Sequence, residues 1–110
     1  CFSEMVCTEL MVSTAARGLG QSGVQVIAAP RATGGHPRWE VASRMAAIAA
    51  GAFVVTANRR GARLAGGSWI VAPDGDILAR TNVNAPIVSH EIDLALVASA
   101  RLTYPRNVRD

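Results

Sequence analysis

The stretch "VQVIAAP", residues 24–30, predicts a buried β-strand and decides the fold class. It is an apolar run rich in β-branched side chains, and Pro30 ends it. A run of this kind, without alternation of apolar and polar residues, is typical of a strand that is covered on both faces. The stretch "AFVVTAN" (52–58) repeats the pattern. We therefore expect two neighbouring strands in the middle of a sheet.

The segment between these strands predicts a helix from Trp39 to Ala50. Its apolar residues Val41, Met45 and Ile48 recur at helical spacing on one face, and Gly51 follows as a C-terminal stop. A strand, a helix and a second strand in this order predict a parallel pair of strands with the helix packed on the sheet.

The stretches on either side extend the pattern. "FSEMV" predicts a short strand that ends at Cys7, and a helix is expected from Thr8 to Leu19, with Gly18, Gly20 and Gly23 marking its end. After residue 58, "SWIVA" and "ILART" flank the turn signal "PDGD" (73–76) and predict a hairpin.

The last third adds "PIVSHEI" (86–92) as a further strand, and "DLALVASARL" as a short helix with Asp93 at its N-cap. We summarise the order as β-α-β-α-β-β-β-α. The early strands predict parallel pairing and the later hairpin makes the sheet mixed, so the fold class is α/β.

The composition fits one small domain or part of a larger one. Half of the 110 residues are hydrophobic and 17% are charged, which suits a packed core and not a disordered chain. No apolar run reaches the roughly 18 residues of a membrane span, and no export signal is visible. The chain begins Cys-Phe-Ser, a start that looks cut.

The charge pattern argues against nucleic acid as a partner. The formal charge is +3, and all basic residues are Arg. These arginines are scattered, with Arg59-Arg60 as the one adjacent pair, whereas a nucleic-acid surface clusters its cations and adds aromatic side chains for stacking. We expect most of these arginines to be solvated surface residues.

The two cysteines, Cys1 and Cys7, are not well placed for a disulfide. If the segment between them is extended it spans about 20 Å, whereas a disulfide needs Cα atoms about 4.4–6.8 Å apart. A reduced, cytoplasmic protein is expected instead. No metal is expected, because His36 and His90 lie far from the cysteines and from each other in sequence, without ligand-pair spacing.

Cys7 stands where a strand is expected to end and a helix to begin. Unpaired N–H groups and the positive end of the helix dipole favour a thiolate there, and the backbone N–H of Thr8 could stabilise an oxyanion. The alternative is a buried cysteine that acts as a small apolar side chain. Position alone leaves both open.

The ordered motifs resemble the nitrilase, or carbon–nitrogen hydrolase, superfamily. "VCTELMVSTAARGLGQSGVQVIAAP" resembles its nucleophile segment, with Cys7, an acidic residue two positions later (Glu9), a helix, Gly23 and Pro30. "RWEVASRMAAIAAGAFVVTANRRG", "GGSWIVAPDGDILART" and "HEIDLALVASAR" then resemble the later family segments in the same order. The resemblance covers almost the whole chain and implies half of an αββα sandwich.

This resemblance implies an amidase or nitrilase reaction on non-peptide C–N bonds, through a cysteine thioester and without a cofactor. Cys7 would be the nucleophile and the Thr8 N–H would bind the oxyanion, while Glu9 would support the turn and not act as the base. The family also needs a Glu and a Lys from upstream segments. The chain has no Lys, and Glu4 lies too close to Cys7 along one strand. Residues 1–110 are therefore interpreted as a single partial domain, the C-terminal portion of such a hydrolase and inactive alone.

Pocket residues are expected in loops at the carboxyl ends of the parallel strands. These loops hold Arg31, Thr33 and Asn58. Arg31 could bind a substrate carboxylate or instead form a surface or interface salt bridge. Asn58 could instead satisfy turn backbone. Trp39 could wall the pocket or belong to the core.

Other functions stay open at this stage. The main alternative is a non-catalytic binding or scaffold protein with the nitrilase fold, and a third class is an Arg-mediated nucleic-acid binder. The expected partner is a small-molecule amide or nitrile, with no nucleic acid and no membrane, and the resemblance suggests a homodimer or larger homo-oligomer.

Overall fold

The computed structural model describes residues 2–32, 36–58, 67–82, 84 and 87–103, and the side chains of Cys7, Thr8 and Ser13 are outside this description. Within these ranges the helices and strands are β1 (Phe2–Glu4), the 3₁₀ helix η1 (Cys7–Met11), α1 (Ser13–Gln21), β2 (Val26–Arg31), α2 (Arg38–Ala50), β3 (Phe53–Asn58), β4 (Trp69–Val71), β5 (Ile77–Arg80) and α3 (Ala95–Ala100).

The sheet has five strands in the order β1-β2-β3-β4-β5. β1, β2 and β3 are parallel, and β3, β4 and β5 are antiparallel, so the mixed α/β sheet is confirmed. The β4–β5 hairpin turns at the predicted residues, where Gly75 has a φ of 95° and its N–H donates to the Ala72 carbonyl (2.9 Å).

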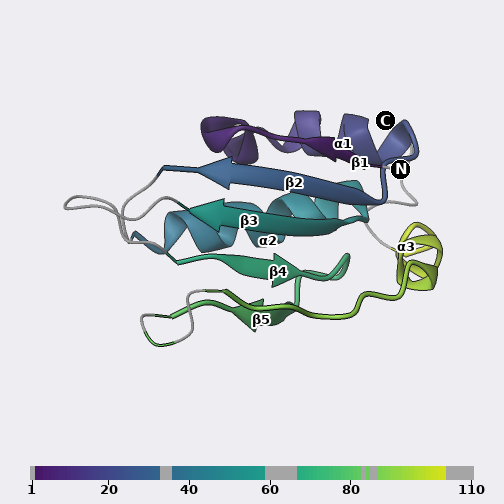
Figure 1. The fold of residues 1–110 in the computed structure, drawn as a ribbon. Coiled ribbons are helices and arrows are strands. Elements are labelled where there is room, and N and C mark those ends of the chain that lie inside the picture. The colour runs from purple at the N-terminus through teal and green to yellow at the C-terminus, as the bar shows by residue number, and fades with distance from the viewer. Residues whose placement is uncertain (1, 33–35, 59–66, 83, 85–86, 104–110) are drawn as a thin grey trace.

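The two long helices cover one face of the sheet (Figure 1). Ile27, Ala29 and Val54 point to this side and form the main core with the small buried residues of α2. We call this the helix face. α3 lies at the amino ends of β2 and β3 on the opposite side, where Val97 packs against Val26 and Phe53.

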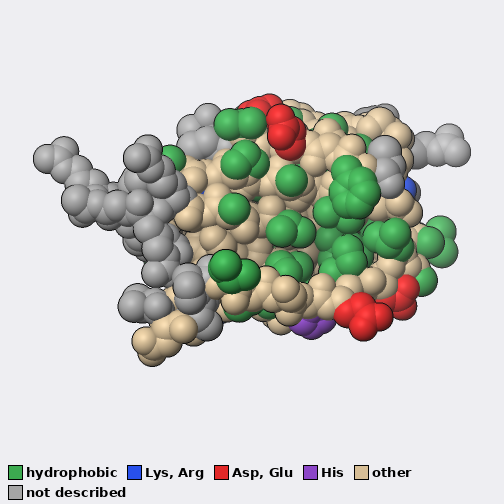
Figure 2. Space-filling model, viewed as in Figure 1, with side chains coloured by type: hydrophobic (Ala, Val, Ile, Leu, Met, Phe, Trp, Pro, Cys, Tyr) green, Lys and Arg blue, Asp and Glu red, His purple; other side chains and the backbone are tan. Residues whose placement is uncertain are grey.

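The rest of that opposite side, the open face, is only partly covered within the described residues, where Val55 and Leu78 pack against the cluster beneath α3. Ala28 and Pro30 of β2 are exposed, as is Ala57 of β3, and the strand register places Pro30 beside Ala57. Figure 2 shows hydrophobic side chains gathered over this side of the sheet. The sequence predicts strands that are covered on both faces, and the described residues cover them fully on one.

The helix expected from Thr8 to Leu19 is two elements. η1 ends at Met11, Val12 is extended (φ −105°, ψ 95°), and α1 starts at Ser13. The β-branched side chain of Val12 favours extended backbone, and the break leaves Leu10 buried while Met11 is exposed.

The prediction that Gly18 and Gly20 end this helix is wrong, because α1 runs through both to Gln21. Gly20 has a packing role. A Cβ there would stand 2.1 Å from the carbonyl oxygen of Ala50, whereas a Cβ at Gly18 would meet nothing within 4 Å. α1 and α2 thus approach each other closely at Gly20. The helix ends before Gly23, which has a φ of 94°.

The predicted core face of α2 is also wrong. Val41 and Met45 are 63% and 45% exposed, and the buried face consists of small residues, namely Ala42, Ser43, Ala46, Ala47, Ala49 and Ala50. Small side chains let α2 approach the sheet and α1 at short range, which turns the larger side chains outward. Gly51 ends the helix with a φ of 65°, as predicted.

The predicted strand at 86–92 is not formed in its described part, residues 87–92. Ile92 packs on the cluster beneath α3, while Ile87 is 86% exposed. The apolar residues thus attach an irregular segment without a strand ladder. α3 starts two residues later than predicted, although Asp93 Oδ1 accepts the Ala95 N–H (2.9 Å), the expected capping contact.

Candidate active site

Cys7 stands at the first position of η1, three residues after Glu4, the last residue of β1. The strand pairing continues through Met5, whose N–H donates to the Ala28 carbonyl (3.0 Å). The first 3₁₀ hydrogen bond is donated by the Glu9 N–H to the Val6 carbonyl (3.1 Å). The N–H groups of Cys7 and Thr8 therefore belong to the first turn, where a helix offers donors to an anion.

Glu9 closes this turn with its side chain. Its Oε1 accepts the Val6 N–H at 2.8 Å, so Val6 and Glu9 are joined by two hydrogen bonds that enclose Cys7 and Thr8. A carboxylate used in this way stabilises the turn. The support role of Glu9 in a catalytic site stays a prediction.

Arg31 and Asn58 end β2 and β3 and are register partners at the carboxyl edge of the sheet. Cys7 follows the carboxyl end of β1, the strand that pairs with β2. The fold therefore brings these three predicted residues to one edge of the sheet.

Arg31 is a buried residue, 5% exposed. Its guanidinium lies over the Trp69 ring, 4.3 Å from the centroid, and Nη2 donates to the Gly67 carbonyl (2.5 Å). These contacts are those of a cation–π pair on the helix face. Substrate binding by Arg31 and its alternative, a surface or interface salt bridge, both stay predictions.

Asn58 is held by its backbone. Its N–H donates to Ser68 Oγ (2.8 Å), and the Ser68 N–H donates to Thr81 Oγ1 (3.0 Å). Two residues earlier in β3, and therefore also on the helix face, Thr56 Oγ1 accepts the Trp69 N–H (2.9 Å). The amino end of β4 is thus fixed against the carboxyl end of β3.

Trp39 lies in the first turn of α2 and is half-buried, and its carbonyl accepts the Ser43 hydroxyl (2.8 Å). Thr33 is outside the described residues. His36 and His90 are exposed, and each has its Nδ1 within hydrogen-bonding distance of nearby backbone. Across the described ranges, no three His, Cys, Asp or Glu side chains gather in a way that could hold a metal ion.

Sequence reasoning missed the residues that hold this edge together, Ser68 and Trp69. Both precede or begin β4, far in sequence from Arg31, so no local spacing indicates the contact. The one available signal was a buried strand that ends in Arg, which calls for a partner for its charge.

Known proteins share features of this sequence and of this fold. The family model described as carbon–nitrogen hydrolase matches residues 1–102. The chain belongs to the carbon–nitrogen hydrolase family. No curated protein sequence matches this carbon–nitrogen hydrolase chain.

Solved structures match it closely. A carbon–nitrogen hydrolase from Helicobacter pylori G27 superposes with a TM-score of 0.86 at 26% identity, over 98% of this chain and 45% of that one. A Saccharomyces cerevisiae member of branch 10 of the nitrilase superfamily gives 0.82 at 22% identity, over 94% and 41%, a likeness of fold alone.

A mutant of the amidase from Nesterenkonia sp. AN1 gives a TM-score of 0.69 at 25% identity, over 74% of this chain and 34% of that one. That amidase carries the acetamide moiety of fluoroacetamide on its active-site cysteine. This carbon–nitrogen hydrolase chain spans less than half the length of each of these three proteins. None of the described helices has the length and apolar character that crossing a membrane requires.

Proposed function

We propose that this chain is the cysteine-bearing part of an enzyme that hydrolyses the C–N bond of a small amide or nitrile. The observation that carries the proposal is the η1 turn. It holds Cys7 at a helix start, shortly after the end of β1, by the paired hydrogen bonds between Val6 and Glu9. The family membership and the covalent adduct on the cysteine of the Nesterenkonia amidase support it.

The reaction with an amide would proceed in two steps. The Cys7 thiolate attacks the carbonyl carbon, and the negative oxygen of the tetrahedral intermediate accepts the Thr8 N–H. The C–N bond then breaks and nitrogen leaves as ammonia or an amine with an added proton, which gives a thioester. Water attacks this thioester and releases the acid and the thiolate.

General acid–base groups are needed for both proton transfers, a contribution of about 10²–10⁴-fold. The Glu9 carboxylate is already bound to the Val6 N–H, and the chain contains no Lys. We propose that a Glu base and a Lys come from segments outside residues 1–110, so that these residues alone are inactive. Cys1 and Cys7 are poorly spaced for a disulfide, and on that ground we propose a reducing, cytoplasmic location.

The substrate contacts predicted from the sequence are Arg31, Thr33, Trp39 and Asn58, and they remain part of the proposal. The support for Asn58 is its fixed place at the same sheet edge as Cys7. Arg31 is stacked on Trp69, so only the guanidinium edge turned away from Gly67 could reach a substrate carboxylate.

A homodimer or larger assembly is also proposed. Its support is the outward stripe of Val41 and Met45 on α2, since exposed apolar side chains on one helix favour a partner surface. Light scattering on the intact protein tests it, and a monomer mass would contradict it.

The test of catalysis is Cys7→Ala in the intact protein that carries this chain. Turnover of small amides and nitriles should fall to background because no group can form the thioester, while circular dichroism stays unchanged. Cys1→Ala is the matched control and should retain turnover. Parental turnover in Cys7→Ala would refute the nucleophile, and an inactive but folded parent would favour the scaffold alternative.

A further inference from the structure

A pocket of about 230 Å³ lies at the amino ends of the central strands, at the opposite end of the sheet from Cys7. Its walls come from the end of α1, the end of α2 and the residue that follows α3. The lining residues are Arg17, Gly20, Gln21, Gly23, Ala49, Ala50 and Arg101. A water molecule occupies about 30 Å³ in the liquid, so the pocket has room for a small solute.

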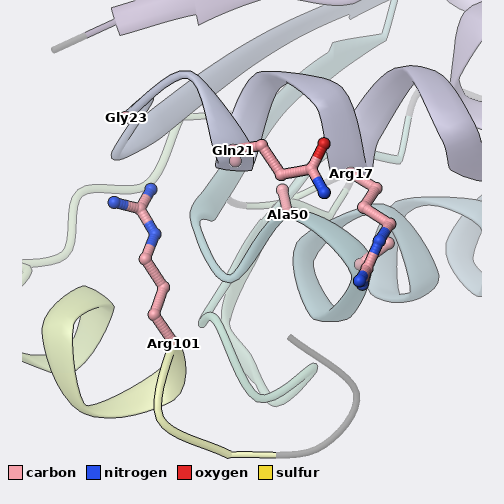
Figure 3. A pocket seen from close by; sticks show the side chains of 7 residues that line it. Arg17, Gln21, Gly23, Ala50 and Arg101 are labelled. Carbon is pink, nitrogen blue, oxygen red and sulfur yellow. The ribbon is translucent and has the colours of Figure 1, made fainter. Parts of the chain in front are cut away.

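The charged side chains that line this pocket are all positive. Arg17 and Arg101 enter from elements that are far apart in sequence, and Figure 3 shows their side chains on two sides of the space, with the Gln21 carboxamide between them. None of the lining residues is an Asp or Glu. The pocket therefore presents two guanidinium groups and an amide without an acidic wall.

Arg101 has donor capacity left over. Its Nη2 donates to the Val24 carbonyl (2.5 Å), which fixes the guanidinium at the pocket wall. Its Nε is buried and has no hydrogen-bond partner among the described residues. A buried donor without an acceptor is costly, and the remaining guanidinium N–H groups of Arg101 are the ones that could face the pocket.

Backbone hydrogen bonds satisfy several carbonyls at the helix ends around the pocket. The Gly18 carbonyl accepts the Ser22 N–H (3.0 Å), and the Gly20 carbonyl accepts the Gly23 N–H (3.1 Å). At the end of α2, the Ala47 carbonyl accepts the Gly51 N–H (2.8 Å). These three carbonyls are satisfied by backbone N–H groups.

We propose that this pocket binds a small oxyanion of the phosphate type, between Arg17 and Arg101 with the Gln21 amide as a further donor. The guanidinium fork matches two oxygens of a tetrahedral oxyanion, and such charge-assisted hydrogen bonds are the strong ones. Because Arg101 follows α3 and Arg17 lies on α1, the bound anion would fasten the C-terminal helix to the α1–α2 layer.

The probe is inorganic phosphate, titrated into the intact protein by calorimetry against chloride at equal ionic strength. The parent should bind phosphate and gain thermal stability from it. Arg17→Gln removes one fork, and Gln21→Glu places a carboxylate in the pocket at an exposed position. Each should weaken binding about 10- to 100-fold, the loss expected for a charge-assisted hydrogen bond.

Arg38→Gln is the matched control, since it removes the same charge from an exposed site at the far end of α2, and it should bind phosphate like the parent. Unfolding temperatures without phosphate identify any variant that fails to fold, and Gln21→Glu then decides alone. No phosphate binding by the parent, or equal binding by parent and Gln21→Glu, would overturn the proposal. Acetate binding as tight as phosphate binding would overturn the preference for a tetrahedral anion.

Discussion

The two faces of the central sheet differ in how much of each face the described residues cover. On the helix face, Ile27 and Val54 are fully buried, and Gly20 lets α1 meet the Ala50 carbonyl at short range. On the open face, α3 covers only the amino ends of the strands, and apolar positions at their carboxyl ends stay exposed. The same β2 and β3 sequences supply both faces.

This difference indicates which face of the sheet would contact further segments of a longer protein. A strand that is apolar on both sides predicts cover on both, and the comparison proteins are more than twice as long as this chain. The open face therefore fits as the contact surface for segments outside residues 1–110. The carboxyl edge with Cys7 borders the same surface, so such segments would also complete the site.

The largest loss of stability is expected from a substitution that disrupts the packing on the helix face. Gly20→Ala should lower the free energy of unfolding of the intact protein by about 2–3 kcal/mol, within the range for overpacking, because the new Cβ would stand 2.1 Å from the Ala50 oxygen. Denaturant unfolding measures it. Gly18→Ala in the same helix is the control and should stabilise by about 0.5–1 kcal/mol. Equal effects of the two changes would contradict the close packing of α1 on α2.

A smaller loss of stability is expected from a substitution on the open face. Ala57→Arg places a charge on this face near the carboxyl end of β3, beside Pro30. If other segments cover this face, the intact protein should lose about 1–3 kcal/mol of stability, the cost of burying a polar group without partners. The control is Ala98→Arg on the exposed side of α3, which should change stability by less than about 0.5 kcal/mol. Equal, small losses would mean that the face is solvent-exposed in the intact protein.

Sequence reasoning succeeded where the signal is local. The β-branched runs place β2 and β3, "PDGD" places the hairpin, and Gly51 ends α2. Periodicity also located α2, but it selected the wrong face. Both the Val41–Met45 stripe and the alanine stripe are apolar, and only the close approach of α1 decides which is buried.

Sequence patterns predicted which edge of the sheet carries the candidate site, but not the contacts that hold its residues in place. The place of Asn58 at its strand end follows from pattern, and parallel strands end on one side. The sequence predicts Arg31 in a loop after Pro30, whereas β2 continues through Pro30 to Arg31. Their partners Trp69 and Ser68 do not follow from pattern, since these contacts join segments that only the folded sheet brings together. The break at Val12 was likewise hidden, because helical spacing continues across it.

The most direct test of the central claim is a covalent adduct on Cys7 in the intact protein. A small haloacetamide is added in slight excess, turnover is followed with time, and peptide mass spectrometry locates the modified cysteine. The account predicts that Cys7 is alkylated much faster than Cys1, because a helix start favours the thiolate, and that turnover falls in step with its modification. Full modification of Cys7 with turnover retained, or loss of turnover while Cys7 stays unmodified, would contradict it.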